Sequence, residues 1–155
     1  MEKMTPVIAV IGGSSVNDDI YEKAVETGVL IAKRGALLVC GGLSGVMEAA
    51  CKGAKSAGGI TIGILPGKKK QSANAFVDIA VPTGISEARN AVIVNMADAL
   101  VAIDGKEGTL SELAFALKQK KPVAGIETFE LRGIMKAQTP KEAVEKVFSV
   151  LKGRK

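Results

Sequence analysis

The chain has 155 residues, of which 47% are hydrophobic and 24% are charged, a composition that supports one folded core and argues against disorder. No apolar run reaches the roughly 18 residues of a membrane-spanning helix, and the first residues do not form a signal-type apolar region. Histidine chemistry is excluded, because no histidine is present to activate a nucleophile or to bind zinc or iron. We therefore expect a soluble, cytoplasmic protein with no membrane partner, whose chemistry depends on carboxylates, arginine, lysine or backbone amides.

The net charge of +5 and the isoelectric point of about 9.3 suit an anionic small ligand. Nucleic acid is not an expected partner, because the chain has no Trp, one Tyr and four Phe, and no predicted helix presents a basic face. The two cysteines, Cys40 and Cys51, are too few for a disulfide scaffold or a zinc site and are predicted to be small core residues. Without histidine or a tight acidic cluster, no metal site is expected.

Hydrophobic periodicity predicts six strands that alternate mostly with five helices. The apolar runs expected to form strands are residues 7–11, 36–40, 61–65, 76–81, 99–103 and 122–126. The amphipathic stretches expected to form helices are residues 18–34, 45–57, 86–96, 109–120 and 140–152. This alternation implies one α/β domain of Rossmann type over residues 1–155, with a single doubly wound, mostly parallel sheet and helices on both faces.

The last predicted helix carries its own start and stop signals. Thr139 stands at the N-cap position, Pro140 follows at the first helical position, and Glu142 completes the spacing of a capping box. Gly153 lies past the end of the helix. The segment is therefore predicted to be structural and to cover a flank of the sheet.

Glycine residues concentrate directly after three of the predicted strands. The clusters are Gly12 and Gly13 followed by Ser14, Gly41 and Gly42 with Gly45, and Gly105 with Gly108. Parallel strands open a crevice at their carboxyl ends, where glycine lets backbone amides and helix N-termini approach a phosphate. Any one loop could be no more than a tight turn, but the three together predict a phosphorylated small-molecule ligand.

The second of these loops nearly matches the fingerprint of dinucleotide-binding proteins. Cys40, however, stands where the first glycine of that fingerprint belongs, and residues 65–68 occupy the place of the acid that binds the ribose. NAD is therefore not an expected cofactor.

Side chains near the glycine loops leave alternatives open. Thr109 and Glu112 stand at capping-box spacing, so Glu112 either bonds back to the amide of the N-cap residue or projects into the crevice beside a phosphate bound at Thr109. Arg89, near a predicted helix start, is either a solvated surface residue, which is the commoner case, or a fork that holds a phosphate or orients a carboxylate.

The order of four segments resembles the LOG (lonely guy) superfamily over nearly the whole chain. The segments are residues 41–48, residues 58–67, Arg89 and residues 108–112. The pairing of Arg89 and Asn90 with residues 109–112 is most similar to a short prokaryotic branch related to molybdenum cofactor carrier proteins. The older label of lysine decarboxylase is not expected to apply, because nothing in the sequence indicates a pyridoxal phosphate site.

The resemblance implies a modified Rossmann fold and a homodimer or homotetramer with the site near the subunit interface. LOG enzymes hydrolyse the N-glycosidic bond of nucleoside 5′-monophosphates to a free base and ribose 5-phosphate, and their catalytic arginine and glutamate match Arg89 and Glu112. No cofactor is required, and the bound ligand is expected to be a nucleotide or the molybdenum cofactor. The residues expected to hold this phosphorylated ligand are Gly12, Gly13, Ser14, Gly41, Gly42, Gly45, Gly105, Lys106, Gly108 and Thr109.

The loop of residues 104–109 departs from the LOG enzymes, which carry Pro-Gly-Gly-x-Gly-Thr there. Asp104 replaces the proline and Lys106 replaces the second glycine, and the lysine side chain either fills the space of a ligand phosphate or supplies charge to it. Asn90 stands where the enzymes have lysine. Two functions therefore stay open: a phosphoribohydrolase that uses Arg89 and Glu112, and a carrier that binds the molybdenum cofactor or a related phosphorylated ligand without turnover.

Overall fold

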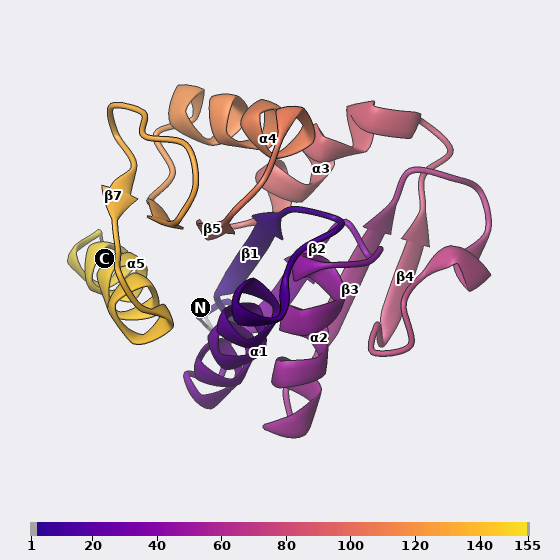
Figure 1. Cartoon of the computed structure of the whole chain (residues 1–155), viewed down its shortest axis with the longest axis horizontal. Helices are drawn as coiled ribbons and strands as arrows, with labels where there is room; N and C mark the ends of the chain where they lie inside the picture. The colour runs from indigo at the N-terminus through magenta and orange to yellow at the C-terminus, as the bar shows by residue number, and fades with distance from the viewer. Residues whose placement is uncertain (1–2, 155) are drawn as a thin grey trace.

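A computed structural model describes residues 3–154, so residues 1, 2 and 155 of the predicted domain lie outside the described residues. Strands alternate with helices along the chain, as the periodicity predicts (Figure 1). The strands are β1 (Val7–Gly12), β2 (Leu37–Cys40), β3 (Thr61–Leu65), β4 (Ile79–Pro82), β5 (Ala99–Ile103), β6 (Val123–Ile126) and β7 (Met135–Lys136). The helices are α1 (Asp18–Lys33), α2 (Val46–Ser56), α3 (Arg89–Met96), α4 (Glu107–Lys118) and α5 (Pro140–Gly153), with the 3₁₀ turns η1 (Lys70–Ser72) and η2 (Ser86–Ala88). None of the helices within residues 3–154 combines the length and the apolar character needed to cross a bilayer.

The strands pair in parallel in one seven-stranded sheet, in the order β4-β3-β2-β1-β5-β6-β7. β1 lies near the centre, between β2 and β5. From β1 the chain builds outward to β4 and then returns to the opposite side of β1 to begin β5. The strand order therefore reverses between β1 and β5, and at such a switch point the carboxyl ends of parallel strands leave room for a ligand.

Strand residues alternate between two buried layers, which explains why helices cover both faces of the sheet. On β1, Ile8 and Val10 belong to the layer formed with α1, α2 and α5, whereas Ala9 and Ile11 belong to the layer formed with α3 and α4. In Figure 1 the first three of these helices lie below the sheet, and α3 and α4 lie above it. The predicted doubly wound α/β fold is confirmed.

α1 and α2 pack at very short range because each contributes a glycine to the contact. A Cβ atom at Gly28 would lie 2.0 Å from the carbonyl oxygen of Ala50, and one at Gly53 would lie 1.9 Å from the carbonyl oxygen of Val25. Any larger residue at either position would push the two helices apart. This close contact holds the N-terminus of α2 beside the end of β1.

The two largest differences from the predicted strands concern the edges of the sheet. β4 begins at Ile79 rather than at residue 76, because Asn74 Oδ1 accepts a hydrogen bond from the amide of Phe76 (3.0 Å) and turns the chain before pairing with β3 begins. The sequence does not indicate β7, since a strand of two residues is too short to show a period.

Cys40 and Cys51 are fully buried free thiols, and their sulfur atoms lie 3.5 Å apart between β2 and α2. The prediction that both are core residues is confirmed.

Candidate functional site

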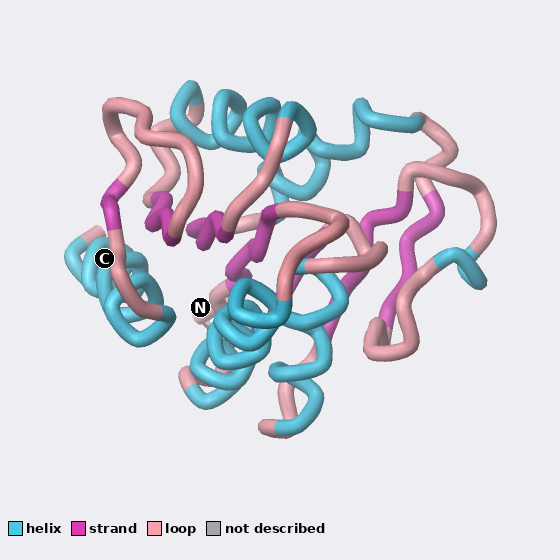
Figure 2. Tube along the Cα trace, viewed as in Figure 1, coloured by secondary structure: helices cyan, strands magenta, loops and turns pink. Residues whose placement is uncertain are grey.

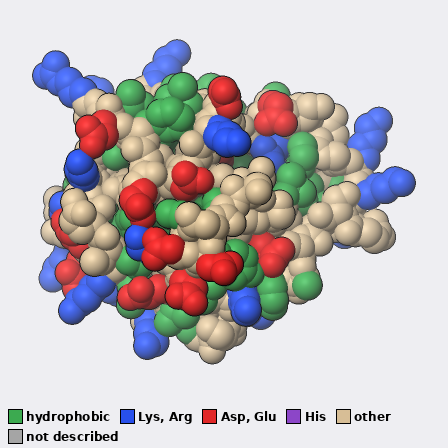
Figure 3. All heavy atoms as spheres, in the orientation of Figure 1, with side chains coloured by type: hydrophobic (Ala, Val, Ile, Leu, Met, Phe, Trp, Pro, Cys, Tyr) green, Lys and Arg blue, Asp and Glu red, His purple; other side chains and the backbone are tan. Residues whose placement is uncertain are grey.

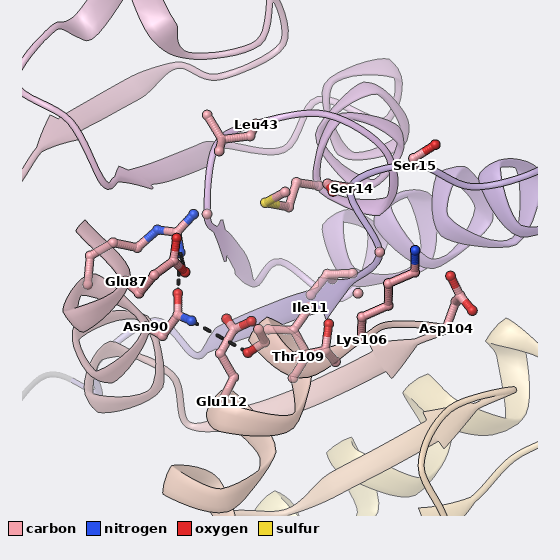
Figure 4. A pocket seen from close by; sticks show the side chains of 17 residues that line it. Ile11, Ser14, Ser15, Leu43, Glu87, Asn90, Asp104, Lys106, Thr109 and Glu112 are labelled. Atoms are coloured by element: carbon pink, nitrogen blue, oxygen red, sulfur yellow. Dashed lines mark hydrogen bonds and ion pairs between the residues drawn. The ribbon is translucent and has the colours of Figure 1, made fainter.

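A cavity of about 230 Å³ opens at the switch point, at the carboxyl ends of β1, β2 and β5 (Figure 4). Its walls come from the three glycine loops, from α3 and α4 and from the turn η2. The lining residues are Val10, Ile11, Gly12, Gly13, Ser14, Ser15, Gly41, Leu43, Met47, Glu87, Arg89, Asn90, Asp104, Lys106, Gly108, Thr109 and Glu112. The three glycine loops that the sequence singles out therefore reach one cavity.

The first two glycine loops are bonded to each other and lie side by side at one end of the sheet (Figure 2). The amide of Val46 donates to the carbonyl of Gly13 (2.9 Å), and the Ser44 hydroxyl donates to the carbonyl of Ser14 (2.8 Å). A Cβ atom at Gly45 would lie 2.2 Å from the Gly13 carbonyl oxygen, and the φ of Gly45 is left-handed at 67°, so only glycine fits there. Gly45 therefore shapes the wall of the cavity without lining it.

Arg89, the first residue of α3, is buried, so the expectation of a solvated surface residue is wrong; only 6% of it is exposed. Its Nε donates to the carbonyl of Ile64 (2.9 Å), and its Nη1 donates to Oδ1 of Asn90. Nη1 also lies 3.9 Å from the Glu87 carboxylate. The other terminal nitrogen, Nη2, lies against Gly41, where an added Cβ would be 2.8 Å away, and it has no acceptor among the described residues. The guanidinium is thus held in place with the Nη2 N–H groups left for a ligand.

Asn90 connects α3 to α4. Besides accepting from Arg89, it donates through Nδ2 to the Ser111 hydroxyl (3.0 Å) and to the carbonyl of Gly108 (3.5 Å). Ser111 donates to the same carbonyl (2.7 Å). Asn90 therefore orients Arg89 relative to the first turn of α4.

α4 begins at Glu107, two residues before the predicted start. Its N-cap residue is Lys106, and no side chain there bonds to the free amides of the first turn. The backbone just before is left-handed, with φ of 55° at Asp104 and 118° at Gly105, and it turns the chain into the helix early. The third and sixth residues of α4, Thr109 and Glu112, therefore line the cavity, and the interpretation of this pair as a capping box is wrong.

The carboxyl group of Glu112 is directed into the cavity between Asn90 and Thr109 (Figure 4). The residue is 8% exposed, and within residues 3–154 no donor bonds to it and no cation pairs with it. Burial raises the pKa of Glu112 to about 8, the positive charge of Arg89 opposes this rise, and the negative charge of Glu87 adds to it. At neutral pH the group is therefore mainly a neutral carboxylic acid.

Two oppositely charged residues of the third loop also line the cavity. Asp104 lies against the first loop, since an added Cβ at Gly13 would be 2.7 Å from its Oδ2. Lys106 is exposed and forms no ion pair with any described residue. Lys106 and the N-terminus of α4 favour an anion in the cavity, whereas the Asp104 carboxylate disfavours one.

Nine of the residues predicted to form the site line the cavity, namely Gly12, Gly13, Ser14, Gly41, Arg89, Lys106, Gly108, Thr109 and Glu112. The other three, Gly42, Gly45 and Gly105, have left-handed φ angles and shape the loops. Sequence reasoning missed Val10, Ile11, Ser15, Leu43, Met47, Glu87, Asn90 and Asp104 as lining residues. Asn90 and Asp104 are polar neighbours of predicted residues and could have been found, whereas Leu43 and Met47 look like core residues. The described residues contain no group of three side chains suited to a metal ion.

A model of the SLOG cluster4 family matches residues 5–152. The chain belongs to the SLOG cluster4 family. This membership confirms the resemblance to the LOG-related superfamily that the sequence motifs indicate.

Two solved structures resemble this SLOG cluster4 protein over nearly its whole length. The molybdenum cofactor binding protein of Rippkaea orientalis is 36% identical with a TM-score of 0.90, over 97% of this chain and 99% of that one. The molybdenum cofactor carrier protein of Chlamydomonas reinhardtii is 35% identical with a TM-score of 0.89, over 96% of this chain and 99% of that one.

Two curated sequences are also similar. A protein of Archaeoglobus fulgidus is 46% identical over 88% of this chain and 91% of its own length. The cytokinin riboside 5′-monophosphate phosphoribohydrolase of Mycobacterium tuberculosis is 32% identical over 64% of this chain and 55% of its own length. The second match therefore spans about half of that enzyme.

Proposed function

We propose that this SLOG cluster4 protein binds a phosphorylated, nucleotide-like ligand in the cavity and carries it without turnover, and that the ligand is the molybdenum cofactor. The observation that carries the proposal is the cavity at the uncapped N-terminus of α4, which is lined by Arg89, Lys106 and Thr109. Hydrolysis of an N-glycosidic bond needs a negative group to stabilise the positive ribosyl centre, and the burial that raises the pKa of Glu112 disfavours an ionised carboxylate at this position. Binding requires only donors, cations and a matching shape.

The anion-binding groups surround the N-terminus of α4. The first amides of this helix have no side-chain cap, and the helix dipole favours negative charge there. Lys106 and Nη2 of Arg89 add positive charge, and Thr109 adds a hydroxyl to the same lining. Similarity to molybdenum cofactor binding and carrier proteins over nearly the whole chain supports the identity of the ligand.

Phosphoribohydrolase activity is the second candidate, and the presence of Arg89 and Glu112 in one cavity favours it. The similarity to the mycobacterial enzyme supports it over part of the chain. For this reaction, substrate binding would have to lower the pKa of Glu112 until the carboxylate is ionised beside the ribosyl centre, while Arg89 orients the sugar phosphate.

Expression in a host that synthesises the cofactor tests the proposal. The purified protein is assayed for molybdenum by mass spectrometry and for a pterin by fluorescence after oxidation, and both are expected. Arg89→Ala is expected to lose both, whereas Arg132→Ala, which removes an exposed arginine outside this cavity, is expected to retain them. Absence of molybdenum and pterin from the parent protein would contradict the ligand assignment.

The same preparations are incubated with nucleoside 5′-monophosphates to test the second candidate. Release of ribose 5-phosphate by the parent protein and not by Glu112→Gln would replace the carrier function with the hydrolase.

Self-association in the cytoplasm is part of the proposal. Ile79 and Val81 on the edge strand β4, and Leu110 and Phe115 on α4, are large apolar side chains exposed in the single chain, and a homodimer or homotetramer would cover such surface. Nucleic acid is not a proposed partner: on the face seen in Figure 3, Lys and Arg lie mostly around the rim, and Asp and Glu lie between them. Equilibrium sedimentation measures the number of subunits.

A further inference from the structure

Three features of the Glu112 side chain bear on ligand binding. It is more than nine-tenths buried, its carboxyl group is directed into the cavity, and no donor among the described residues reaches it (Figure 4). An ionised carboxylate buried without donors is strongly disfavoured. A carboxylic acid in the same place needs only one acceptor for its O–H and offers one carbonyl oxygen in return.

The neighbouring polar groups already have other partners. The Nδ2 group of Asn90 donates to Ser111 and to the carbonyl of Gly108. Arg89 is held by Ile64 and Asn90, and it forms no ion pair with Glu112 among the described residues. The hydrogen bonds of the Glu112 carboxyl group are therefore left for a molecule in the cavity.

We infer that Glu112 binds the ring of the ligand as a neutral carboxylic acid, donating its O–H to a ring acceptor and accepting a hydrogen bond from an adjacent ring donor. The inference rests on the proposed function, because it assumes a phosphorylated, ring-bearing ligand in this cavity. The inference also specifies the edge of the ring that Glu112 contacts: this edge carries one hydrogen-bond donor next to one hydrogen-bond acceptor. Such edges occur on purines and pterins, whereas two adjacent donors would favour an ionised carboxylate.

The positions on α4 agree with this arrangement. Thr109 and Glu112 are three residues apart and therefore lie on one face of the helix. A phosphate near Lys106 and the helix N-terminus leaves the ring beside Glu112, where Ile11 and Met47 supply apolar contacts from the cavity lining.

This mode of binding makes affinity depend on pH. The titratable or charged groups around Glu112 are Arg89 of α3, Glu87 of η2, Asp104 and Lys106 of the third loop, and the buried Cys40 thiol at the end of β2. β1 contributes only apolar and glycine residues to the lining. When Glu112 ionises, it loses the O–H donor that the ring acceptor requires, so ring binding weakens as pH rises.

Calorimetric titration with two defined probes tests the inference. AMP carries an amino donor beside a ring acceptor, and ribose 5-phosphate lacks the ring. Because the pKa of Glu112 is about 8, AMP is expected to bind the parent protein about tenfold more weakly at pH 9 than at pH 7. Glu112→Gln, which keeps one donor and one acceptor, is expected to bind AMP with the same affinity at both pH values. Ribose 5-phosphate is expected to show no such difference between the two proteins.

The outcomes separate the inference from the proposed function. Two outcomes would overturn binding by a neutral Glu112 and leave the phosphate site standing. One is an affinity for AMP that rises with pH. The other is a loss of AMP binding in Glu112→Gln while ribose 5-phosphate still binds. Equal affinities for AMP and ribose 5-phosphate would overturn ring recognition alone. Failure of both probes to bind the parent protein would contradict the inference and the phosphate site together.

Carbon-13 NMR of the side-chain carboxyl groups provides a measurement without ligand. The Glu112 signal, assigned by its loss in Glu112→Gln, is expected to titrate near pH 8. A midpoint in the ordinary range of a glutamate, about 4.3, would overturn the inference.

Discussion

The same four-residue spacing of threonine and glutamate occurs at the start of α4 and at the start of α5, with opposite results. At α5, Thr139 accepts a hydrogen bond from the amide of Glu142 (3.2 Å), and Glu142 accepts one from the amide of Gln138 (2.9 Å) and pairs with Lys146 (2.9 Å). The hydrogen bond from the Gln138 amide and the pairing with Lys146 lower the pKa of Glu142. At α4 the helix starts earlier, the glutamate has no partner among the described residues, and burial raises its pKa to about 8.

The difference shows that the backbone conformation before a helix decides whether a threonine–glutamate pair caps the helix or lines a cavity. Pro140 stands at the first position of α5 and favours a helix start there. Before α4, the left-handed residues Asp104 and Gly105 bring the helix start forward to Glu107. Thr139 therefore caps α5, whereas Thr109 lines the cavity.

Replacing the buried acid has the largest expected effect on stability. Glu112 holds its proton more tightly in the folded state, so the parent protein loses stability as pH rises from about 4.5 to about 8. Above pH 8, Glu112→Gln is expected to exceed the parent protein in free energy of unfolding by on the order of 3–5 kcal/mol. Urea unfolding at pH 5 and pH 9 measures this gap, which is expected to be small at pH 5.

Glu142→Gln is the matched control, because the contribution of Glu142 to stability depends on pH with the opposite sign. The lowered pKa of Glu142 contributes stability above its ordinary pKa that is lost as pH falls through the lowered value. A gap between Glu112→Gln and the parent protein that does not change with pH would contradict the buried, neutral acid.

Changing Arg89 to lysine is expected to weaken ligand binding about 10- to 100-fold. Lysine keeps the charge but loses the fork that reaches the Ile64 carbonyl, Asn90 and the ligand together. Calorimetry with ribose 5-phosphate measures the loss, with Arg132→Lys as the control at an exposed arginine. Affinity within twofold of the parent protein would remove Arg89 from the binding site.

Removing each threonine separates the two helix starts directly. Thr139→Ala is expected to lower the free energy of unfolding by about 1 kcal/mol, because it removes the cap of α5. Thr109→Val has no cap to remove and nearly preserves the buried volume, so it is expected to weaken phosphate binding and to change stability by less than Thr139→Ala. Urea unfolding measures the free energy of unfolding of both variants. A larger loss of stability in Thr109→Val than in Thr139→Ala would restore the capping-box interpretation of Thr109.

Removing the charge of Lys106 is expected to have the smallest effect. Because this side chain is exposed, Lys106→Gln should reduce affinity for ribose 5-phosphate by about two- to fivefold at low salt and by less at high salt. Lys118→Gln, at the far end of the same helix, is the control. Tighter binding by Lys106→Gln would mean that the lysine fills the phosphate position instead of charging it.

Sequence reasoning recovers the fold more completely than the site. Six strands and five helices follow from apolar periodicity, because burial on one or both faces of a sheet requires it. β7 is missed because its neighbours, not its two residues, create the strand. Arg89 illustrates the corresponding limit in the site: nothing in its local sequence shows that Ile64 and Asn90 will hold it in a buried position.

The order of residues alone decides the α/β layers, the location of the glycine loops after the strands and the absence of histidine chemistry, because these depend on composition and local period. Tertiary structure decides which loops share a cavity and what charge Glu112 carries. Those properties arise from burial by elements far apart in the chain: β1, β2 and β5 bring three loops together, and α3 places Arg89 in the same cavity as Glu112. Desolvation and distance between charges exist only after these elements have packed.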